Sequence, residues 1–584
     1  MNIYLHQKNN NIGDLEASTE TIIQAIQNKD QIGLHLFSEL YLGGYPLQDL
    51  CLQKPFRKKY QNCLIELKKN FACDSSQTVL FGGLDYDNNE KDEIINIYNC
   101  VYLLDHNGLK NIYRKQLLPN YDIYDEKKYF SPGKKNCFIE INNHLFLVLI
   151  CEDMWHSTAH EIDPVQSALK EYRENYLKNG KPLGGVINLS ASPFHINKQE
   201  KRICRGKDIS SMFDAPFFYV NQVGLNDEIL FDGQSFIIGQ SELIKAKRFM
   251  DQNLVYSISD HSNSIATDDV NISNKVENTW ETLFDARIDS ETKRLKQLKD
   301  EELEEILSGL TFALNEYANK TNMSSFLVAM SGGIDSAVAL AVSYLASKAS
   351  KFSIEAVYMP SQFNSNLSYE LSNEMCKKIG IKLKVINLKF IHQTIKMTYK
   401  DGIGQELSGL ADENIQSRLR GNLIYARSNQ SNAMVVNTSN KSELSVGYST
   451  LYGDSEGAIS VLGDLYKTEV YRLADFINKH FNNIIPDGII KRAPSAELRE
   501  DQRDDDNLPP YDRLDLILEC LLSYQFSYND IEKLNISRDE IDQVVKLFNR
   551  SEFKRKQFCP IIKLKPKSFG FGYRNPILKN GVFN

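Results

Sequence analysis

Short apolar runs alternate with polar turns through the front half of the chain. Four of these runs end at polar residues: IGLHLFSEL from Ile32, HLFLVLICED ending at Asp153, GGVINLSASP and APFFYVNQVG. Their length and their content of β-branched and aromatic residues predict buried β-strands. Because active-site residues often lie at the ends of such strands, the polar residues that close these runs are the first candidates for chemistry.

The pattern of apolar positions breaks once and then restarts. From about Ser257 to Leu298 the chain is polar and charged without sustained apolar periodicity, which favours a linker. Beyond it, apolar residues recur at helical spacing, at Leu303, Ile306, Leu307, Leu310, Ala313, Leu314 and Tyr317. The run FLVAM and a glycine pair follow, which indicates a second α/β domain. We predict a first domain at 1–256, a linker at 257–299 and a second domain at 300–584, in which REDQRDDDNLPPY forms a surface loop before a helical tail.

Length and composition narrow the class of protein. With 584 residues, 42% hydrophobic and 25% charged, the chain is long enough for two or three globular domains. Its net charge of −8 gives no broad cationic field, which argues against nucleic acid or an anionic membrane as the main partner. Ten cysteines without CxxC pairs suit a reducing compartment, and no apolar stretch approaches the roughly eighteen residues of a membrane helix. We expect a cytoplasmic protein that acts on small molecules.

The segment FLVAMSGGIDSAVALAVSYLASKA predicts a strand, a tight turn and a helix. Glycines let backbone amides approach an anion closely, and a helix N-terminus adds partial positive charge, so the turn suits a pyrophosphate. It is not a Walker A loop, because the GxxxxGK[ST] spacing is absent. A bare glycine pair with Asp335 and Ser336 capping the helix would be an ordinary turn. The whole string SGGIDSA, however, resembles the loop of the ATP pyrophosphatases, which split ATP between the α and β phosphates.

Four further sequence segments indicate which member of that superfamily the chain resembles. ADENIQSRLRGNLIYARSN, VVNTSNKSELSVGYSTLYGD, GDLYKTEVYRLA and PSAELREDQRDDDNLPPYDRLD follow in the order and spacing of NAD synthetase, so the chain resembles this family over nearly everything after Leu303. The resemblance implies ATP contacts at Ser331, Gly332, Gly333, Asp335, Ser336, Thr438 and Lys467. It implies deamido-NAD contacts at Asn414, Arg420, Glu443, Tyr448 and Lys554.

The same resemblance implies a Mg²⁺ ion held by Asp335 and Glu443. Carboxylate oxygens are the hard ligands that this ion prefers, and the ion can neutralise charge on the departing pyrophosphate. Taken singly, each charged residue could instead be a solvated helix-face charge or a cap. The sequence also departs from the family: Ser439 replaces a usual glycine, which predicts a stiffer loop, and Leu451 and Ala458 replace polar contacts of the ammonia-only enzymes.

In the front half, VLICEDMW brings Cys151 to the end of a buried run, where a lone cysteine is by default a core thiol. Two other strings change this interpretation: FSELYLGGYPLQDL contains Glu39, and YRKQLLPNYDIYDEKKYF contains Lys115. A cysteine nucleophile needs a base and donors for the oxyanion. Together the three strings resemble the nitrilase-type carbon–nitrogen hydrolases, and in particular the glutaminase domain of glutamine-dependent NAD synthetases.

This second resemblance implies that Cys151 is the nucleophile and Glu39 the base, with Lys115 and the backbone N–H of Glu152 stabilising the tetrahedral intermediate. It implies glutamine contacts at Tyr121, Ser192 and Lys198. Glu126 is either a further acid near the triad or a surface carboxylate in its DEKK context. The histidines lack the HExxH spacing of a zinc site, and no GxSxG elbow indicates a serine nucleophile.

The two resemblances imply an α/β protein with two domains. The first is a nitrilase-like α-β-β-α sandwich, and the second is a doubly wound parallel α/β synthetase domain of the adenine nucleotide α-hydrolase kind. The implied reaction is the ATP-dependent amidation of deamido-NAD to NAD with ammonia released from glutamine, giving AMP, pyrophosphate and glutamate. Mg²⁺ is the implied cofactor, ATP is a co-substrate, and we expect a homo-oligomer with a shielded route for ammonia.

Two alternatives remain open from the sequence. A GMP synthetase-like enzyme would share the ATP loop but use a different glutaminase type and a different acceptor. A regulatory nucleotide-binding protein that has lost catalysis would have broken triad or metal positions, whereas all five are present: Glu39, Lys115, Cys151, Asp335 and Glu443.

Overall fold

The structure of the chain is a computed structural model that describes residues 1–71, 77–89, 93–155, 162–239, 242–258, 287–289, 291–495, 497–499 and 508–578. The contacts divide the chain into two compact units, Met1–Asn274 and Lys275–Asn584. Most of the predicted linker, 259–286 and 290, and most of the predicted acidic loop, 500–507, lie outside the described residues.

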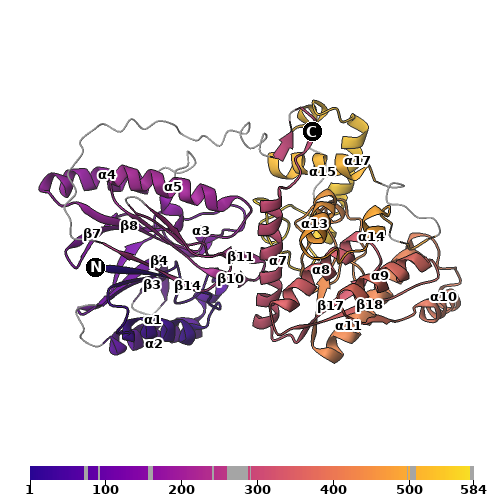
Figure 1. Ribbon diagram of the computed structural model, residues 1–584, viewed down its shortest axis with the longest axis horizontal. Helices are drawn as coiled ribbons and strands as arrows, with labels where there is room; N and C mark the ends of the chain where they lie inside the picture. Colours follow the sequence, from indigo (N-terminus) through magenta and orange to yellow (C-terminus); the bar gives the residue numbers. More distant parts are fainter. Residues whose placement is uncertain are drawn as a thin grey trace. The chain divides into compact units, whose positions relative to one another are not determined.

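The front unit is built on two six-stranded sheets (Figure 1). The first sheet has the order β14 (Gln252–Ser257), β1 (Asn2–Gln7), β2 (Leu34–Phe37), β3 (Thr78–Asn88), β4 (Ile94–Asp105) and β5 (Gly108–Arg114). The second has the order β13 (Leu243–Lys245), β12 (Phe236–Ile238), β9 (Phe217–Asn221), β8 (Leu183–Ser190), β7 (His144–Ile150) and β6 (Cys137–Ile141). Parallel pairing joins β1 to β2 to β3 and β7 to β8 to β9. The four predicted strands are therefore present as β2, β7, β8 and β9.

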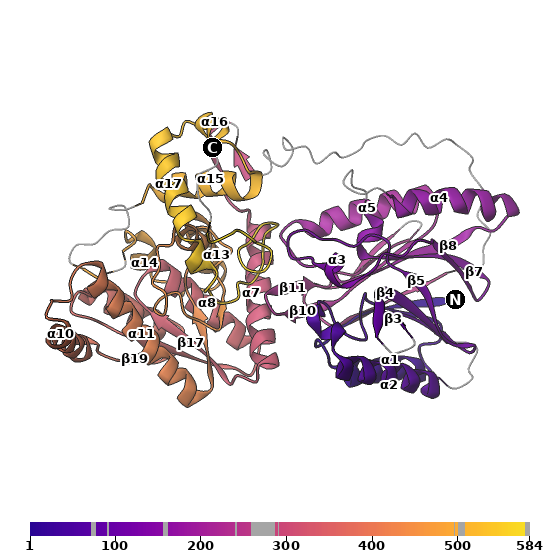
Figure 2. The ribbon, with the colours of Figure 1, turned by 180° about the vertical axis from the view of Figure 1, so that it is seen from behind.

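Alternation of side chains along the strands separates three apolar layers. Leu36 and Val148 lie in the core between the two sheets. Phe37, the next residue, faces the other way and packs with helices α1 (Leu15–Gln27) and α2 (Lys54–Asn70), while α4 (Pro164–Asn175) and α5 (Lys198–Phe213) pack on the second sheet. Figure 2 shows these helix pairs on the outer sides of the sheets. The expected α-β-β-α sandwich is confirmed.

The back unit contains a five-stranded parallel sheet. Its order is β19 (Leu383–Val385), β18 (Ser353–Tyr358), β17 (Ser325–Met330), β20 (Ala433–Asn437) and β21 (Ile459–Ser460). The order of the strands reverses at β17, so the carboxyl ends of β17 and β20 flank the switch point at which such sheets bind ligands. Helices α8 (Ile334–Lys348) and α11 (Leu410–Ser431) pack against the sheet, α8 on β17 and β18 and α11 on β17 and β20. The expected doubly wound sheet is also confirmed.

Other helices complete both units. Helix α7 (Asp300–Lys320) is the amphipathic helix predicted after the linker, and it packs with α13 (Lys467–His480) against α8. The front unit also contains α3 (Glu126–Tyr129) and the hairpin β10 (Val223–Asn226) and β11 (Ile229–Asp232). The back unit also contains β15 (Ile288–Asp289), β16 (Arg294–Leu295), α9 (Asn366–Lys378), α10 (Lys389–Ile403), α12 (Lys441–Val446), α14 (Asp487–Lys491), α15 (Tyr511–Glu519), α16 (Tyr528–Glu532), α17 (Arg538–Arg550) and α18 (Glu552–Arg555).

The last part of the predicted linker packs into the back unit. Ile288 is buried in an apolar core formed with α15 and α17, and the Arg287 guanidinium lies 2.5 Å from the Glu469 carboxylate. No helix in the described ranges combines the length and the apolar content that crossing a bilayer requires.

Candidate active sites

Cys151 begins a tight turn at the end of a buried strand. Strand β7 ends at Ile150, and residues Cys151–Met154 form a 3₁₀ turn. The Cys151 backbone has φ +43, in the left-handed region that non-glycine residues rarely adopt. Its N–H donates to Oδ1 of Asn188 on the neighbouring strand β8 at 3.1 Å. Such strain persists where the surroundings hold it, which is common at active sites.

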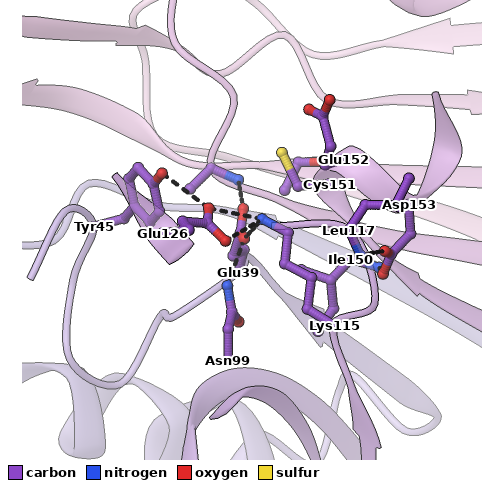
Figure 3. A network of polar contacts seen from close by, with 12 residues as sticks. Glu39, Tyr45, Asn99, Lys115, Leu117, Glu126, Ile150, Cys151, Glu152 and Asp153 are labelled. Carbon is purple, nitrogen blue, oxygen red and sulfur yellow. Dashed lines mark hydrogen bonds and ion pairs between the residues drawn. The ribbon is translucent and has the colours of Figure 1, made fainter. Parts of the chain in front are cut away.

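Glu39, Lys115 and Cys151 belong to one cluster in the front unit (Figure 3). The Lys115 ammonium donates to Glu39 Oε1 at 2.7 Å and to both oxygens of Glu126 at 2.8 Å. The three charged side chains are at most 4% exposed. Lys115 follows strand β5 and Glu39 follows β2, so two strand ends bring the residues together. Figure 3 shows Cys151 beside this group.

The surface alternative for Glu126 is wrong. Glu126 starts helix α3 and is buried, and its Oε1 also accepts a hydrogen bond from the Tyr45 hydroxyl at 3.0 Å. Asn99, which the sequence analysis missed, donates to Glu39 Oε1 at 2.7 Å. The backbone N–H of Ala191 donates to Glu39 Oε2 at 2.9 Å. Both oxygens of Glu39 are therefore fixed in position.

The electrostatics of the cluster depend on burial. Burial raises the pKa of the Cys151 thiol well above its usual range, Glu39 raises it further, and Lys115 opposes the change. Burial lowers the pKa of Lys115, but Glu126 and Glu39 outweigh this effect and raise it well above its usual range. Burial likewise raises the pKa of Glu126, against the opposing charge of Lys115. Lys115 is thus a permanent cation close to a thiol that needs a base to ionise.

Two of the three predicted glutamine contacts, Tyr121 and Ser192, adjoin residues that flank this cluster. The Tyr121 hydroxyl donates to the two carboxylate oxygens of Glu152, the residue after Cys151, at 3.1 and 3.2 Å. Ser192 follows Ala191, whose N–H binds Glu39, and the Ser192 hydroxyl accepts from Arg202 at 3.2 Å. Lys198 begins α5, and its ammonium donates to the Pro193 carbonyl at 2.9 Å.

A cavity of about 520 Å³ opens in the back unit at the ends of β17 and β20. Of the predicted residues, Ser331, Gly333, Asp335, Ser336, Asn414, Arg420, Thr438, Glu443, Tyr448, Lys467 and Lys554 line it. Gly332 belongs to the same turn but packs behind the cavity wall, where a Cβ would come within 2.7 Å of the Ser368 carbonyl oxygen. The sequence analysis missed Arg492 and Glu497, which also line the cavity.

The turn after β17 is closed by its two serines. The hydroxyls of Ser331 and Ser336 lie 3.0 Å apart, and the Gly333 N–H donates to Ser331 Oγ at 3.2 Å. Gly332 has φ +82, which a residue with a Cβ would adopt only under strain. Helix α8 begins at Ile334, directly after the turn, so its N-terminus points into the cavity wall.

The Lys467 ammonium contacts both predicted metal ligands, Asp335 and Glu443. It lies 2.5 Å from Asp335 Oδ2 and 3.4 Å from Glu443 Oε1. Asn440 caps α12, and its side-chain N–H donates to Asp335 Oδ1 at 2.9 Å. Two carboxylates from different elements thus converge on one cation beside the phosphate turn.

The predicted deamido-NAD residues line other parts of the cavity wall. Arg420 donates to the Met359 carbonyl at 3.0 Å, and burial lowers its pKa. Asn414 Oδ1 accepts from the Thr450 hydroxyl at 2.8 Å, and the Lys554 ammonium donates to the Gly447 carbonyl at 2.7 Å.

Ser439 is tied into its loop by both of its donor groups. Its N–H donates to Asn437 Oδ1 at 2.9 Å, and its hydroxyl donates to the Asp454 carbonyl at 3.2 Å. The hydroxyl therefore adds a hydrogen bond that a glycine at this position would lack.

Known proteins resemble the chain along its whole length. The family model for NAD synthase matches residues 306–558. The glutamine-dependent NAD(+) synthetase of Aquifex aeolicus is 33% identical over 99% of both chains, and that of Acinetobacter baylyi is 32% identical over 99% of this chain and 98% of its own.

Two solved structures agree with these relatives. The glutamine-dependent NAD+ synthetase of Acinetobacter baumannii, determined in complex with ADP, superimposes with a TM-score of 0.68 at 28% identity and covers 99% of this chain and 98% of its own. The Cytophaga hutchinsonii enzyme has a TM-score of 0.77 with the same coverage, and at 19% identity it supports the fold alone. Because relatives that are more than 30% identical over the full length are glutamine-dependent NAD(+) synthetases, the chain belongs to this family.

Proposed function

We propose that this enzyme, which amidates deamido-NAD to NAD with ATP and glutamine, divides its reaction between the two sites described above. The front unit, with a domain at 1–256, releases ammonia from glutamine. The back unit, with a domain at 300–584, activates deamido-NAD and accepts the ammonia. The observation that carries the first assignment is the buried Glu39–Lys115–Glu126 cluster beside Cys151.

In the front site, Glu39 takes the proton of the Cys151 thiol, and the thiolate attacks the amide carbon of glutamine. The Lys115 cation and the backbone N–H of Glu152 stabilise the negative oxygen of the tetrahedral intermediate. The intermediate collapses to a thioester, and the proton returns to the nitrogen that leaves as ammonia. Water then hydrolyses the thioester to glutamate. We assign glutamine contacts to Tyr121, Ser192 and Lys198.

In the back site, the nicotinate carboxylate of deamido-NAD attacks the α phosphate of ATP and expels pyrophosphate. The backbone of the Ser331–Ser336 turn, Thr438 and the Lys467 ammonium bind the phosphates; the helix N-terminus after the turn supports this assignment. Asn414, Arg420, Glu443, Tyr448 and Lys554 hold deamido-NAD. Ammonia then attacks the mixed anhydride and displaces AMP.

The carboxylates of Asp335 and Glu443 fit a Mg²⁺ ion. They already converge on one cation, the Lys467 ammonium. No cluster of three or more His, Cys, Asp or Glu side chains suited to a metal occurs in the described ranges, but Mg²⁺ commonly takes one or two protein carboxylates and completes its shell with water and substrate phosphates. We propose that these two residues hold the ion, which when bound neutralises charge on the phosphates.

We also propose that the enzyme is a homo-oligomer in the cytoplasm and that it has a shielded route for ammonia. None of these three features is needed for the chemistry at either site.

The experiment that tests the function supplies purified enzyme with deamido-NAD, ATP, Mg²⁺ and glutamine. NAD and AMP should form in equal amounts together with glutamate, and ammonium salt in place of glutamine should give NAD and AMP without glutamate. Asp335→Asn should lose NAD formation from both nitrogen sources while it still hydrolyses glutamine. Amidation of xanthosine monophosphate instead of deamido-NAD would support the GMP synthetase-like alternative.

A further inference from the structure

Asp153 is a fully buried acid two residues after Cys151. It belongs to the 3₁₀ turn that begins at Cys151, and it has no exposed surface. The proposed chemistry gives it no role. Its side chain nevertheless accepts four hydrogen bonds from two segments, Tyr113–Leu117 and the end of β7.

The bonds are distributed over both oxygens of the carboxylate. Oδ1 accepts from the backbone N–H groups of Gln116 at 3.1 Å and Leu117 at 2.8 Å. Oδ2 accepts from the Tyr113 hydroxyl at 2.7 Å and from the Ile150 N–H at 3.2 Å. Three of the four donors are backbone amides, which cannot rotate away from the carboxylate.

These donors flank the two residues that must meet during catalysis. Gln116 and Leu117 directly follow Lys115, and Ile150 directly precedes Cys151. We propose that Asp153 is a positioning residue that fixes the end of the Lys115 segment relative to the Cys151 turn. A single planar carboxylate thereby sets the distance between the ammonium and the thiol. The proposal rests on the proposed function of the front site.

Stability alone does not account for a charged group at this position. Burial raises the pKa of Asp153 to about 6, against its hydrogen bonds and the charge of Lys115. A raised pKa means that folding disfavours the ionised form. The cost of burying this charge is offset by the hydrogen bonds from the segments that the carboxylate joins.

The test compares Asp153→Asn with the matched variant Tyr113→Phe. The amide that Asp153→Asn introduces offers one acceptor oxygen, so it cannot serve the donors of both segments. Tyr113→Phe removes one hydrogen bond to the same carboxylate but leaves all three backbone bonds. Each variant is treated with increasing amounts of iodoacetamide, and the remaining glutaminase activity is measured to count the reactive Cys151 thiols. Turnover is then expressed per reactive thiol.

We expect Asp153→Asn to lower kcat for glutamine hydrolysis per titrated site about 10²-fold, the scale of a misplacement near 1 Å, with KM for glutamine nearly unchanged. Tyr113→Phe should keep kcat within a few-fold of the wild type. NAD formation from ammonium salt should be unchanged in both variants. Asp153→Glu, which keeps the charge but adds one methylene, should lower kcat as well. This variant replaces Asp153→Asn in the comparison if Asp153→Asn does not fold.

Equal kcat per titrated site in Asp153→Asn and Tyr113→Phe would overturn the proposal, as would full activity of Asp153→Glu. Failure of the proposed function itself would appear differently, because the wild-type enzyme would then release no glutamate and iodoacetamide would not affect its use of glutamine.

Discussion

At the scale of single residues, the front site concentrates charge where water is excluded. One buried cation, Lys115, faces two buried carboxylates, Glu39 and Glu126. Removing ions from water is costly, and a buried group of this kind is stable only while every member keeps its partners. The arrangement therefore links catalysis and folding through the same side chain.

Lys115→Met keeps the length of the side chain but removes its charge. Glutamine turnover should fall about 10²-fold or more, the scale of losing one donor to the oxyanion. Because Glu39 and Glu126 would lose their counter-ion, the front unit should also lose roughly 3–5 kcal/mol of stability. Ammonia release and thermal unfolding measure the two effects. A folded variant with normal turnover would remove Lys115 from the chemistry.

His6 on β1 and His35 on β2 form a buried polar pair to which the proposed chemistry gives no role. His35 Nε2 contacts two acceptors, the Gln31 carbonyl at 2.9 Å and Gln77 Oε1 at 3.0 Å, so it carries the proton. His35 Nδ1 must then accept from His6 Nε2, which lies 2.9 Å away. Burial, and next the charge of His35, lower the pKa of His6 from 6.5 to about 3.

The lowered pKa predicts acid sensitivity of the front unit. The folded state resists protonation of His6 while the unfolded chain accepts it, so stability is complete above pH 6.5 and declines as the pH falls toward 3. Between pH 7 and pH 5 this histidine alone should cost about 2 kcal/mol. Urea unfolding followed by loss of glutaminase activity measures the change. His6→Gln, which keeps a donor for His35, should reduce the pH dependence, and an unchanged slope would contradict the assignment.

At the scale of elements, the Ser331–Ser336 turn between β17 and α8 depends on the backbone conformation of one glycine. Gly332 combines a positive φ with close packing against the backbone of Ser368, at the start of α9. Gly380, at the other end of that helix, has φ +75 but no atom within 4 Å of the position of a Cβ.

The pair of glycines separates backbone strain from steric clash. Gly380→Ala should cost about 1 kcal/mol of stability and leave synthesis intact. Gly332→Ala carries the same strain and must also displace backbone, so it should impair NAD formation from both nitrogen sources. Thermal unfolding and the two synthesis assays give the comparison. Similar activity in the two variants would mean that the turn tolerates displacement.

The same elements show what the sequence could and could not predict. Runs of apolar residues predict the four front strands, and apolar residues at helical spacing predict α7. Both patterns are readable because these apolar residues are buried in cores. Glu126 and Asn99 could not be placed in this way. The first sits in a charged local sequence and the second on strand β4. Only the approach of β2, β4, β5 and α3 brings Glu126 to the Lys115 ammonium and Asn99 to the Glu39 carboxylate. Asp153 likewise gains its significance from amides distant in sequence.

The linker boundary was hard to predict for a related reason. Arg287 lies in polar sequence, yet it pairs with Glu469 of α13. Local composition describes how a segment would behave in isolation, whereas a partner supplied by a distant helix decides whether it packs.

At the scale of the whole molecule, each unit has its own core and its own cluster of polar residues. Among the residues that the structure describes, the Cys151 cluster uses only ones before Asn274, and those that line the cavity at the Ser331–Ser336 turn all follow Lys275. A change in one cluster should therefore affect one half-reaction, provided that the variant remains folded.

Cys151→Ala tests this division directly. Without the thiol no thioester can form, so NAD synthesis from glutamine should stop, whereas synthesis from ammonium salt should continue near the wild-type rate because the back site is untouched. Replacing a buried thiol also leaves a small cavity, which can lower stability; thermal unfolding of the same sample separates that effect from lost chemistry. Loss of both activities in folded protein would mean that Cys151 is not a dedicated glutaminase nucleophile. Retention of both would mean that ammonia is released from glutamine by other residues.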